Sequence, residues 1–126
     1  MSTTQKEQCP VEQYYKGWND QSLDEMAAAL HPKFRFRGPM EQHESPASFL
    51  ASCEKMIKSP AMKGSTVNVR ARLRDNDQVV VLYDWVSADK KGSLPMAEYF
   101  KVADGKIKEI QLYFDTAKMA IPKEAL

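Results

Sequence analysis

The spacing of apolar residues divides the chain into a helical part and a strand-rich part. Before residue 60, large apolar side chains recur three or four positions apart, which is the period of an amphipathic helix. From Thr66 onward, apolar and polar residues alternate, which is the period of a strand with one buried face. Helices followed by a run of strands are typical of an α+β fold, in which the helices cover one face of a curved antiparallel sheet. We therefore expect an α+β protein.

Three helices are predicted, near residues 10–18, 22–30 and 46–58. The first would carry four large side chains on one face, namely Val11, Tyr14, Tyr15 and Trp18. Ser22 and Glu25 form a capping box at the start of the second helix. Pro46 suits the first turn of the third helix, directly after a serine that can cap it.

The strands are predicted from alternation and from turn residues. A short strand with Phe34 and Phe36 on one side ends at Gly38, before the third helix. The second half of the chain predicts a four-stranded meander over residues 66–74, 78–86, 93–102 and 107–114. Asp104-Gly105 is a favoured two-residue hairpin turn between the last two of these strands.

One charged residue interrupts an apolar strand face. The predicted strand 93–102 has apolar residues at alternate positions of that face, namely Leu94, Met96, Phe100 and Val102. Glu98 takes the remaining position. A carboxyl group that faces a core is costly unless it is protonated, paired or placed in a wet pocket. Two interpretations stay open: an ion pair with an arginine such as Arg35 or Arg37, or a functional carboxyl with a raised pKa.

Helical spacing and strand parity together predict one cavity. Its expected lining is Tyr14, Trp18, Phe36, Phe49, Met56, Met96, Glu98, Phe100, Leu112 and Phe114. Tyr83 and Trp85 are large, partly polar aromatic residues that either line the cavity or fill the core. Asp115 ends the last predicted strand, where a side chain can reach a cavity mouth or cap the turn that begins at Thr116.

Composition narrows the classes of partner. Eighteen Lys and Arg residues against 17 Asp and Glu leave a net charge of +1 with both signs mixed, which argues against nucleic-acid binding. Neither a membrane span nor a signal peptide is recognisable, so a cytoplasmic protein is expected. Cys9 and Cys53 lack a CxxC arrangement, and His31 and His43 form no HExxH motif. We therefore expect neither a metal nor a cofactor.

The order and spacing of several short motifs resemble the nuclear transport factor 2-like superfamily. These motifs are Val11-Glu12-Gln13-Tyr14, Trp18-Asn19-Asp20, Leu23-Asp24, Phe34-Arg35-Phe36, Glu98-Tyr99-Phe100-Lys101 and Asp104-Gly105-Lys106-Ile107. The ketosteroid isomerase and SnoaL-type polyketide cyclase branches are the most similar in appearance, and the ending Tyr113-Phe114-Asp115 resembles the SnoaL-like pattern. The resemblance implies one SnoaL-like domain over residues 1–126, with a core of about 10–119. It also implies a cone-shaped, curved antiparallel sheet wrapped around three N-terminal helices (a cystatin-like α+β barrel), a blind apolar pocket and a homodimer.

The resemblance also implies roles for single residues. Tyr14 takes the place of the oxyanion-donating tyrosine of the isomerases, and Glu98 that of the protonated acid beside it. Gly38 stands where that branch has its general base, a departure that argues against steroid isomerisation. SnoaL-like cyclases carry an acid/base aspartate near the end of the last strand, where Asp115 lies. His31, just before the strand that forms the pocket, is a minor candidate.

Two main classes of function follow. As an enzyme, the protein would be a cofactor-independent isomerase, cyclase or lyase that acts on a carbon acid such as a ketone or polyketide. Asp115 would take a proton, while Tyr14 and Glu98 would stabilise the enolate oxygen. As a non-catalytic binder, the protein would hold a small apolar or carbonyl-containing molecule in the same pocket. A protein-interaction module would instead use the outer face of the sheet, which carries Tyr99, Tyr113 and Val86.

Overall fold

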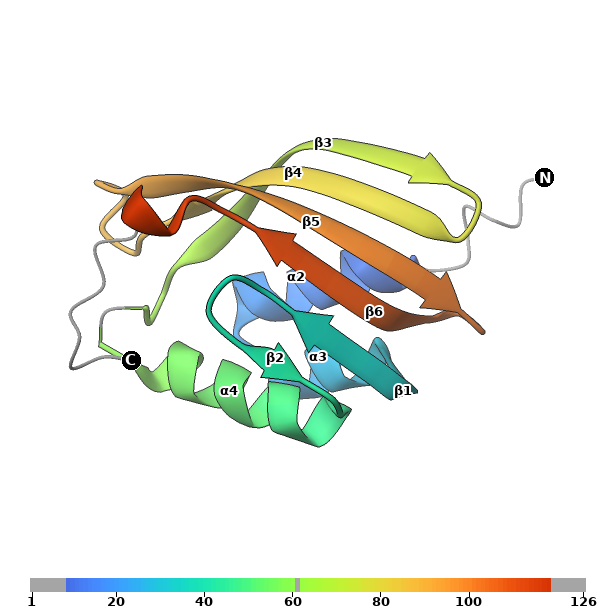
Figure 1. Cartoon of the computed structure of the whole chain (residues 1–126). Helices are drawn as coiled ribbons and strands as arrows, with labels where there is room; N and C mark the ends of the chain where they lie inside the picture. The colour runs from blue at the N-terminus through green and yellow to red at the C-terminus, as the bar shows by residue number, and fades with distance from the viewer. Residues whose placement is uncertain (1–8, 61, 119–126) are drawn as a thin grey trace.

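The computed structural model describes residues 9–60 and 62–118, with helices first and strands afterwards (Figure 1). The helices are α2 (Pro10–Asp20), α3 (Leu23–Ala28), α4 (Pro46–Lys58) and the short 3₁₀ helix η1 (Thr116–Lys118). The strands are β1 (Leu30–Arg37), β2 (Gln42–His43), β3 (Thr66–Asp75), β4 (Gln78–Val86), β5 (Ser93–Ala103) and β6 (Lys106–Tyr113). The expected end of the core at residue 119 and the first eight residues lie outside the described part.

The six strands form one curved sheet in the order β2-β1-β6-β5-β4-β3. Strands β3 to β6 make the predicted antiparallel meander, and in its register Glu98 lies between Val81 of β4 and Leu112 of β6. β1 differs from the expectation, because it runs parallel to β6. A parallel pair needs a long connection between its strands, and here most of the chain separates the two.

The helices cover the concave face of this sheet. In Figure 1, α2 lies beneath the long strands, while α4 lies beside β1 and β2. Two tyrosines of α2 pack on the sheet: the ring centroids of Tyr14 and Tyr15 lie 5.9 and 5.7 Å from that of Phe100, both edge-on. The structure therefore confirms the predicted α+β arrangement, in which a curved sheet closes around N-terminal helices.

The second helix is shorter than predicted, because the first strand begins early. α3 ends at Ala28, and Leu30 already pairs with Ile107 of β6. α2 and α3 approach closely at Gly17, where an added Cβ would lie 2.6 Å from Cγ of Met26. This contact fixes α2, which carries the tyrosines of the site described below.

The described residues also bear on the expectations from composition. No helix in residues 9–60 and 62–118 is long and apolar enough to cross a lipid bilayer. Within the same ranges, no three His, Cys, Asp or Glu side chains cluster as a metal site requires. Both cysteines are free thiols, Cys9 half-buried and Cys53 buried.

Candidate functional site

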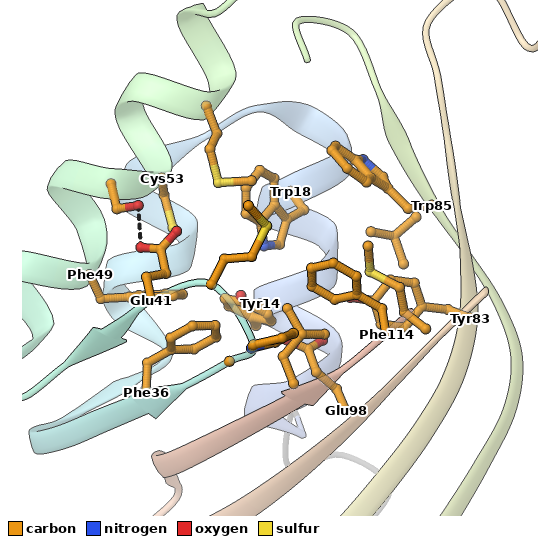
Figure 2. A pocket seen from close by; sticks show the side chains of 18 residues that line it. Tyr14, Trp18, Phe36, Glu41, Phe49, Cys53, Tyr83, Trp85, Glu98 and Phe114 are labelled. Atoms are coloured by element: carbon orange, nitrogen blue, oxygen red, sulfur yellow. Dashed lines mark hydrogen bonds between the residues drawn. The ribbon is translucent and has the colours of Figure 1, made fainter. Parts of the chain in front are cut away.

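The concave side of the sheet forms the wall of an apolar cavity, which α2, α4 and the loop between β1 and β2 complete (Figure 2). The cavity has a volume of about 110 Å³ and opens to solvent at its mouth. Residues expected from the sequence contribute most of the lining. They are Tyr14, Trp18, Phe36, Phe49, Met56, Tyr83, Trp85, Met96, Glu98, Leu112 and Phe114.

Phe100 is a correction to the predicted lining. Its side chain does face inward, as strand parity predicted, but it is 0% exposed and is not among the lining residues. The rings of Tyr14 and Tyr15 cover it on the helix side. Strand parity gives the face of a residue and not its depth, so Phe100 belongs to the core beneath the cavity.

Asp115 and His31 also lie outside the lining. Asp115 is exposed, and its carboxylate accepts the backbone N–H of Ala117 at 3.0 Å, which is the capping role left open by the sequence. The Nδ1 atom of His31 accepts the backbone N–H of Lys33 at 3.0 Å, and its Nε2 atom lies 3.3 Å from the Asp104 carboxylate. Local contacts therefore hold both side chains away from the cavity.

Glu98 points inward from β5 and is 3% exposed. Its Oε1 atom accepts a hydrogen bond of 2.6 Å from the hydroxyl group of Tyr15. The bond comes from Tyr15 and not from its neighbour Tyr14, which the sequence had paired with Glu98. Arg35 and Arg37 are both exposed, so the alternative of a buried ion pair with either arginine is wrong.

Burial changes the ionisation of Glu98. Loss of hydration raises the pKa of Glu98 from 4.5 to about 7, because the charged form is the one that water stabilises. Hydrogen bonds from Tyr15 and Tyr83 favour the charged form and act in the opposite direction. At neutral pH, Glu98 is therefore divided between a neutral acid that can donate a hydrogen bond and a carboxylate that cannot.

Tyr14 presents a phenol on the cavity wall between Glu98 and α4 (Figure 2). Burial raises the pKa of Tyr14, and the negative charge of Glu98 raises it further, while a hydrogen bond with Trp18 acts in the opposite direction. The rings of Phe49 and Phe100 pack against Tyr14 with centroids 6.3 and 5.9 Å away. The phenol is thus a fixed group that keeps its proton and can donate it in a hydrogen bond.

Sequence reasoning missed a second carboxyl group in the cavity, which belongs to Glu41. This residue lies in the loop between β1 and β2, and its side chain is 40% exposed. The hydroxyl group of Ser52 donates to Oε1 of Glu41 at 2.7 Å (Figure 2), and Nε2 of His43 contacts the same oxygen. The backbone N–H of Gly38 bonds to the carbonyl of Glu41 at 2.9 Å and closes the turn that places Glu41 at the cavity.

Gly38 explains why this carboxyl group lies where it does. Gly38 lines the cavity without a side chain, and an added Cβ would lie 3.1 Å from the ring of Phe36. The turn then places a carboxyl group three residues further along the chain. No alternation of apolar and polar residues marks Glu41 in the sequence, because it lies in the loop before the two-residue strand β2.

The arrangement brings two carboxyl groups of different character into one apolar cavity. Glu98 is buried and partly neutral, whereas the Glu41 side chain is partly exposed and accepts hydrogen bonds. No Lys, Arg or His side chain contributes to the lining in the described part of the chain. Such a pair can present a proton donor and a proton acceptor to the same bound molecule.

A curved sheet closed by helices around an apolar pocket defines the nuclear transport factor 2-like class of folds. The family model of the SnoaL-like domain matches residues 11–110, and the chain belongs to this family. No curated protein sequence matches the chain.

Solved structures of several proteins have the same fold. An epoxide hydrolase of M. tuberculosis, described as LEH-like, is 17% identical with a TM-score of 0.73, over 87% of this chain and 83% of that chain. A protein of ketosteroid isomerase-like fold from Catenulispora acidiphila, in complex with trimethylamine, is 12% identical with a TM-score of 0.73, over 91% and 95%. TerC, co-crystallised with polyporic acid, is 17% identical with a TM-score of 0.71, over 87% and 92%. At these identities the likeness concerns the fold.

Proposed function

We propose that this protein moves a proton at a carbon acid, such as a ketone or polyketide, as an isomerase, cyclase or lyase without a cofactor. The observation that carries the proposal is the pair of carboxyl groups in one apolar cavity. Glu98 has a pKa raised to about 7, and the partly exposed side chain of Glu41 accepts hydrogen bonds. A pocket that only binds an apolar molecule needs no such pair, whereas proton transfer needs an acid and a base together.

In the proposed reaction, Glu41 replaces Asp115 as the base. The Glu41 carboxylate takes a proton from the carbon next to the carbonyl group, and the C–H electron pair becomes the new carbon–carbon π bond. The carbonyl π electrons move onto oxygen, and this enolate oxygen accepts hydrogen bonds from Tyr14 and from neutral Glu98. Glu41 then returns the proton to the same carbon or to another carbon of the enolate.

Relatives of the same fold support a small-molecule site. One is in complex with trimethylamine and another is co-crystallised with polyporic acid. In this chain the cavity walls consist mainly of aromatic and methionine side chains, which favours a flat, largely apolar compound with one polar group. A non-catalytic binder would hold its ligand against the same cavity walls and would need no proton transfer by Glu41.

The test uses β-tetralone, an aryl ketone with acidic C–H bonds, in deuterium oxide. Wild-type protein is expected to speed the exchange of its α-hydrogens, followed by NMR. β-Naphthol, a stable mimic of the enol, should bind to the wild type and more weakly to Tyr14→Phe in calorimetry, because one oxyanion donor is lost. Tyr99→Phe is the matched control, since that phenol bonds to Gln78 away from the cavity. Equal affinity of wild type and Tyr14→Phe for β-naphthol would contradict the oxyanion role of Tyr14. Absence of β-tetralone exchange in the wild type would contradict the enzyme and favour the non-catalytic binder.

We also propose that the outer face of the sheet joins two copies of the chain. A row across this face contains Ala71, Leu82, Ala97 and Tyr113, which pair in register from β3 to β6. Leu82 of β4 and Tyr113 of β6 are 37% and 49% exposed and lie on either side of β5, so the row forms a continuous exposed patch with apolar and aromatic side chains. Two such faces could bury each other in a symmetric dimer.

The dimer predicts a mass of twice 14.3 kDa in light scattering. Leu82→Glu places a charge at the centre of the row, so it should give a monomer with intact secondary structure. Ala51→Glu, which adds the same charge on the exposed side of α4, should leave the dimer unchanged. A monomeric wild type contradicts the proposal.

A further inference from the structure

His43 lies beside the cavity without lining it, and two aromatic rings hold its imidazole ring. In the register of β1 and β2, His43 pairs with Phe36. Its ring centroid lies 6.0 Å from that of Phe36 and 5.9 Å from that of Phe49. The side chain is only 12% exposed. The imidazole is therefore confined at the back of the loop that carries Glu41.

Hydrogen bonds define the tautomer of this ring. Nε2 of His43 contacts Oε1 of Glu41, and Nδ1 lies 2.6 Å from Oγ of Ser48. An ionised carboxylate only accepts hydrogen bonds, so Nε2 must carry the hydrogen. Nδ1 of the neutral ring is then an acceptor, and the Ser48 hydroxyl group donates to it. A single chain of donors thus runs from Ser48 through His43 to Glu41.

The two donors to Glu41 converge on the same oxygen atom. Both His43 and Ser52 bond to Oε1, and within the described residues no hydrogen bond is made to Oε2. Figure 2 shows the Glu41 carboxylate beside Cys53, at the edge of the cavity. A carboxylate held by one oxygen keeps its second oxygen at a fixed position, available to a bound molecule.

We propose that His43 is a positioning residue, which fixes Glu41 so that Oε2 is the atom that accepts the substrate proton. This inference rests on the proposed function. His43 neither touches the substrate nor receives its proton. It keeps Oε2 in place through the hydrogen bond to Oε1, while Ser48 keeps the imidazole ring in the tautomer that can donate. Displacement of a reacting group by about 1 Å can lower a rate by about 100-fold.

The group of Ser48, His43 and Glu41 is not a serine-hydrolase triad. In such a triad the serine contacts Nε2 and the acid contacts Nδ1, whereas here the serine contacts Nδ1 and the acid Nε2. Ser48 is exposed and does not line the cavity, whereas Glu41 does. The chain of hydrogen bonds therefore ends at Glu41, and Glu41 is the residue of this group that can contact a bound substrate.

Replacement of His43 tests the positioning role, with β-tetralone exchange as the assay. His43→Gln keeps an N–H group near the place of Nε2 and should stay within about threefold of the wild type. His43→Phe keeps the aromatic packing without a donor, so kcat should fall about 10- to 100-fold with little change in KM. His31→Gln is the matched control, because His31 also faces a carboxylate, that of Asp104, but lies outside the cavity.

Each outcome has a defined meaning. Equal rates for wild type and His43→Phe overturn the inference and leave the proposed function standing. A rise in KM at constant kcat also overturns it, because His43 would then shape the binding site. A wild type that exchanges no β-tetralone overturns the proposed function and the inference with it. Loss of exchange in Ser48→Ala to the extent caused by removing Glu41 overturns the positioning role and points to Ser48 as the reacting group.

A measurement on unmodified protein keeps the inference testable if His43→Phe does not fold. Imidazole nitrogen chemical shifts, measured by NMR, report which ring nitrogen carries hydrogen. The inference expects hydrogen on Nε2 of His43 and none on Nδ1 in the neutral ring. A neutral ring with hydrogen on Nδ1 alone overturns it, because Nε2 would then have nothing to donate to Glu41.

Discussion

Glu41→Gln is expected to lower the rate of β-tetralone exchange by about 10²- to 10⁴-fold, the range ascribed to a positioned general base. Glutamine has nearly the same size, and its amide oxygen can still accept from Ser52, which donates to Glu41 at 2.7 Å. The variant therefore removes the basic oxygen without emptying the site. Affinity for β-naphthol should persist, because Tyr14 and Glu98 remain. The loss should appear in kcat and not in binding.

The control for this change is Glu44→Gln. Glu44 lies three residues further along the chain, is largely exposed and pairs with Arg35 at 3.7 Å. The Glu44→Gln variant loses the same charge close to the same loop, so this variant should exchange β-tetralone at the wild-type rate. If Glu41→Gln keeps a rate within tenfold of the wild type, Glu41 is not the base, and the cavity is better explained as a binding site.

Many helices and strands were predictable because patterns within short segments of the sequence determine them. The change of period at Thr66 placed β3 to β6 within a residue or two, and Ser45 with Pro46 marked the start of α4. The parallel pairing of β1 with β6 was not predictable from periodicity, since it joins segments from opposite halves of the chain. β2 has only two residues, which is too short for alternation to show.

The candidate site was predictable only in part, for physical reasons that differ among residues. Glu98 stood out because its charge interrupted the apolar face of a strand. Its burial followed from the alternation of side chains between the two faces of that strand. Tyr14 and Tyr15 lie on one buried helix face, and spacing alone cannot tell which phenol reaches Glu98. Glu41 lies in a turn, where no period applies, so only the folded chain shows that it faces the cavity. Asp115 follows the last strand, but the chain turns into η1 there and carries its carboxylate outward.

Glu98 should also make the stability of the protein depend on pH. Its pKa is about 7 in the folded protein, against 4.5 for an ordinary glutamic acid. The folded state therefore holds a proton that the unfolded state releases between these two values. Where the folded state binds more protons, stability falls as pH rises. Below pH 4.5 both states are protonated and burial of the neutral acid carries no charge penalty. Above pH 7 the full penalty of a buried carboxylate applies.

Glu98→Gln is expected to remove this dependence. The pKa difference corresponds to about 3 kcal/mol over the window from pH 4.5 to 7. Urea unfolding at a series of pH values should show the wild type losing that much stability relative to the variant, with the difference constant above pH 7. Subtraction cancels the other titrating groups, and exposed Glu44→Gln should run parallel to the wild type. Parallel curves for wild type and Glu98→Gln would show that the pKa of Glu98 is the same in the folded and unfolded states. Glu98 would then be ionised at neutral pH, and such a carboxylate could not donate a hydrogen bond to an enolate oxygen.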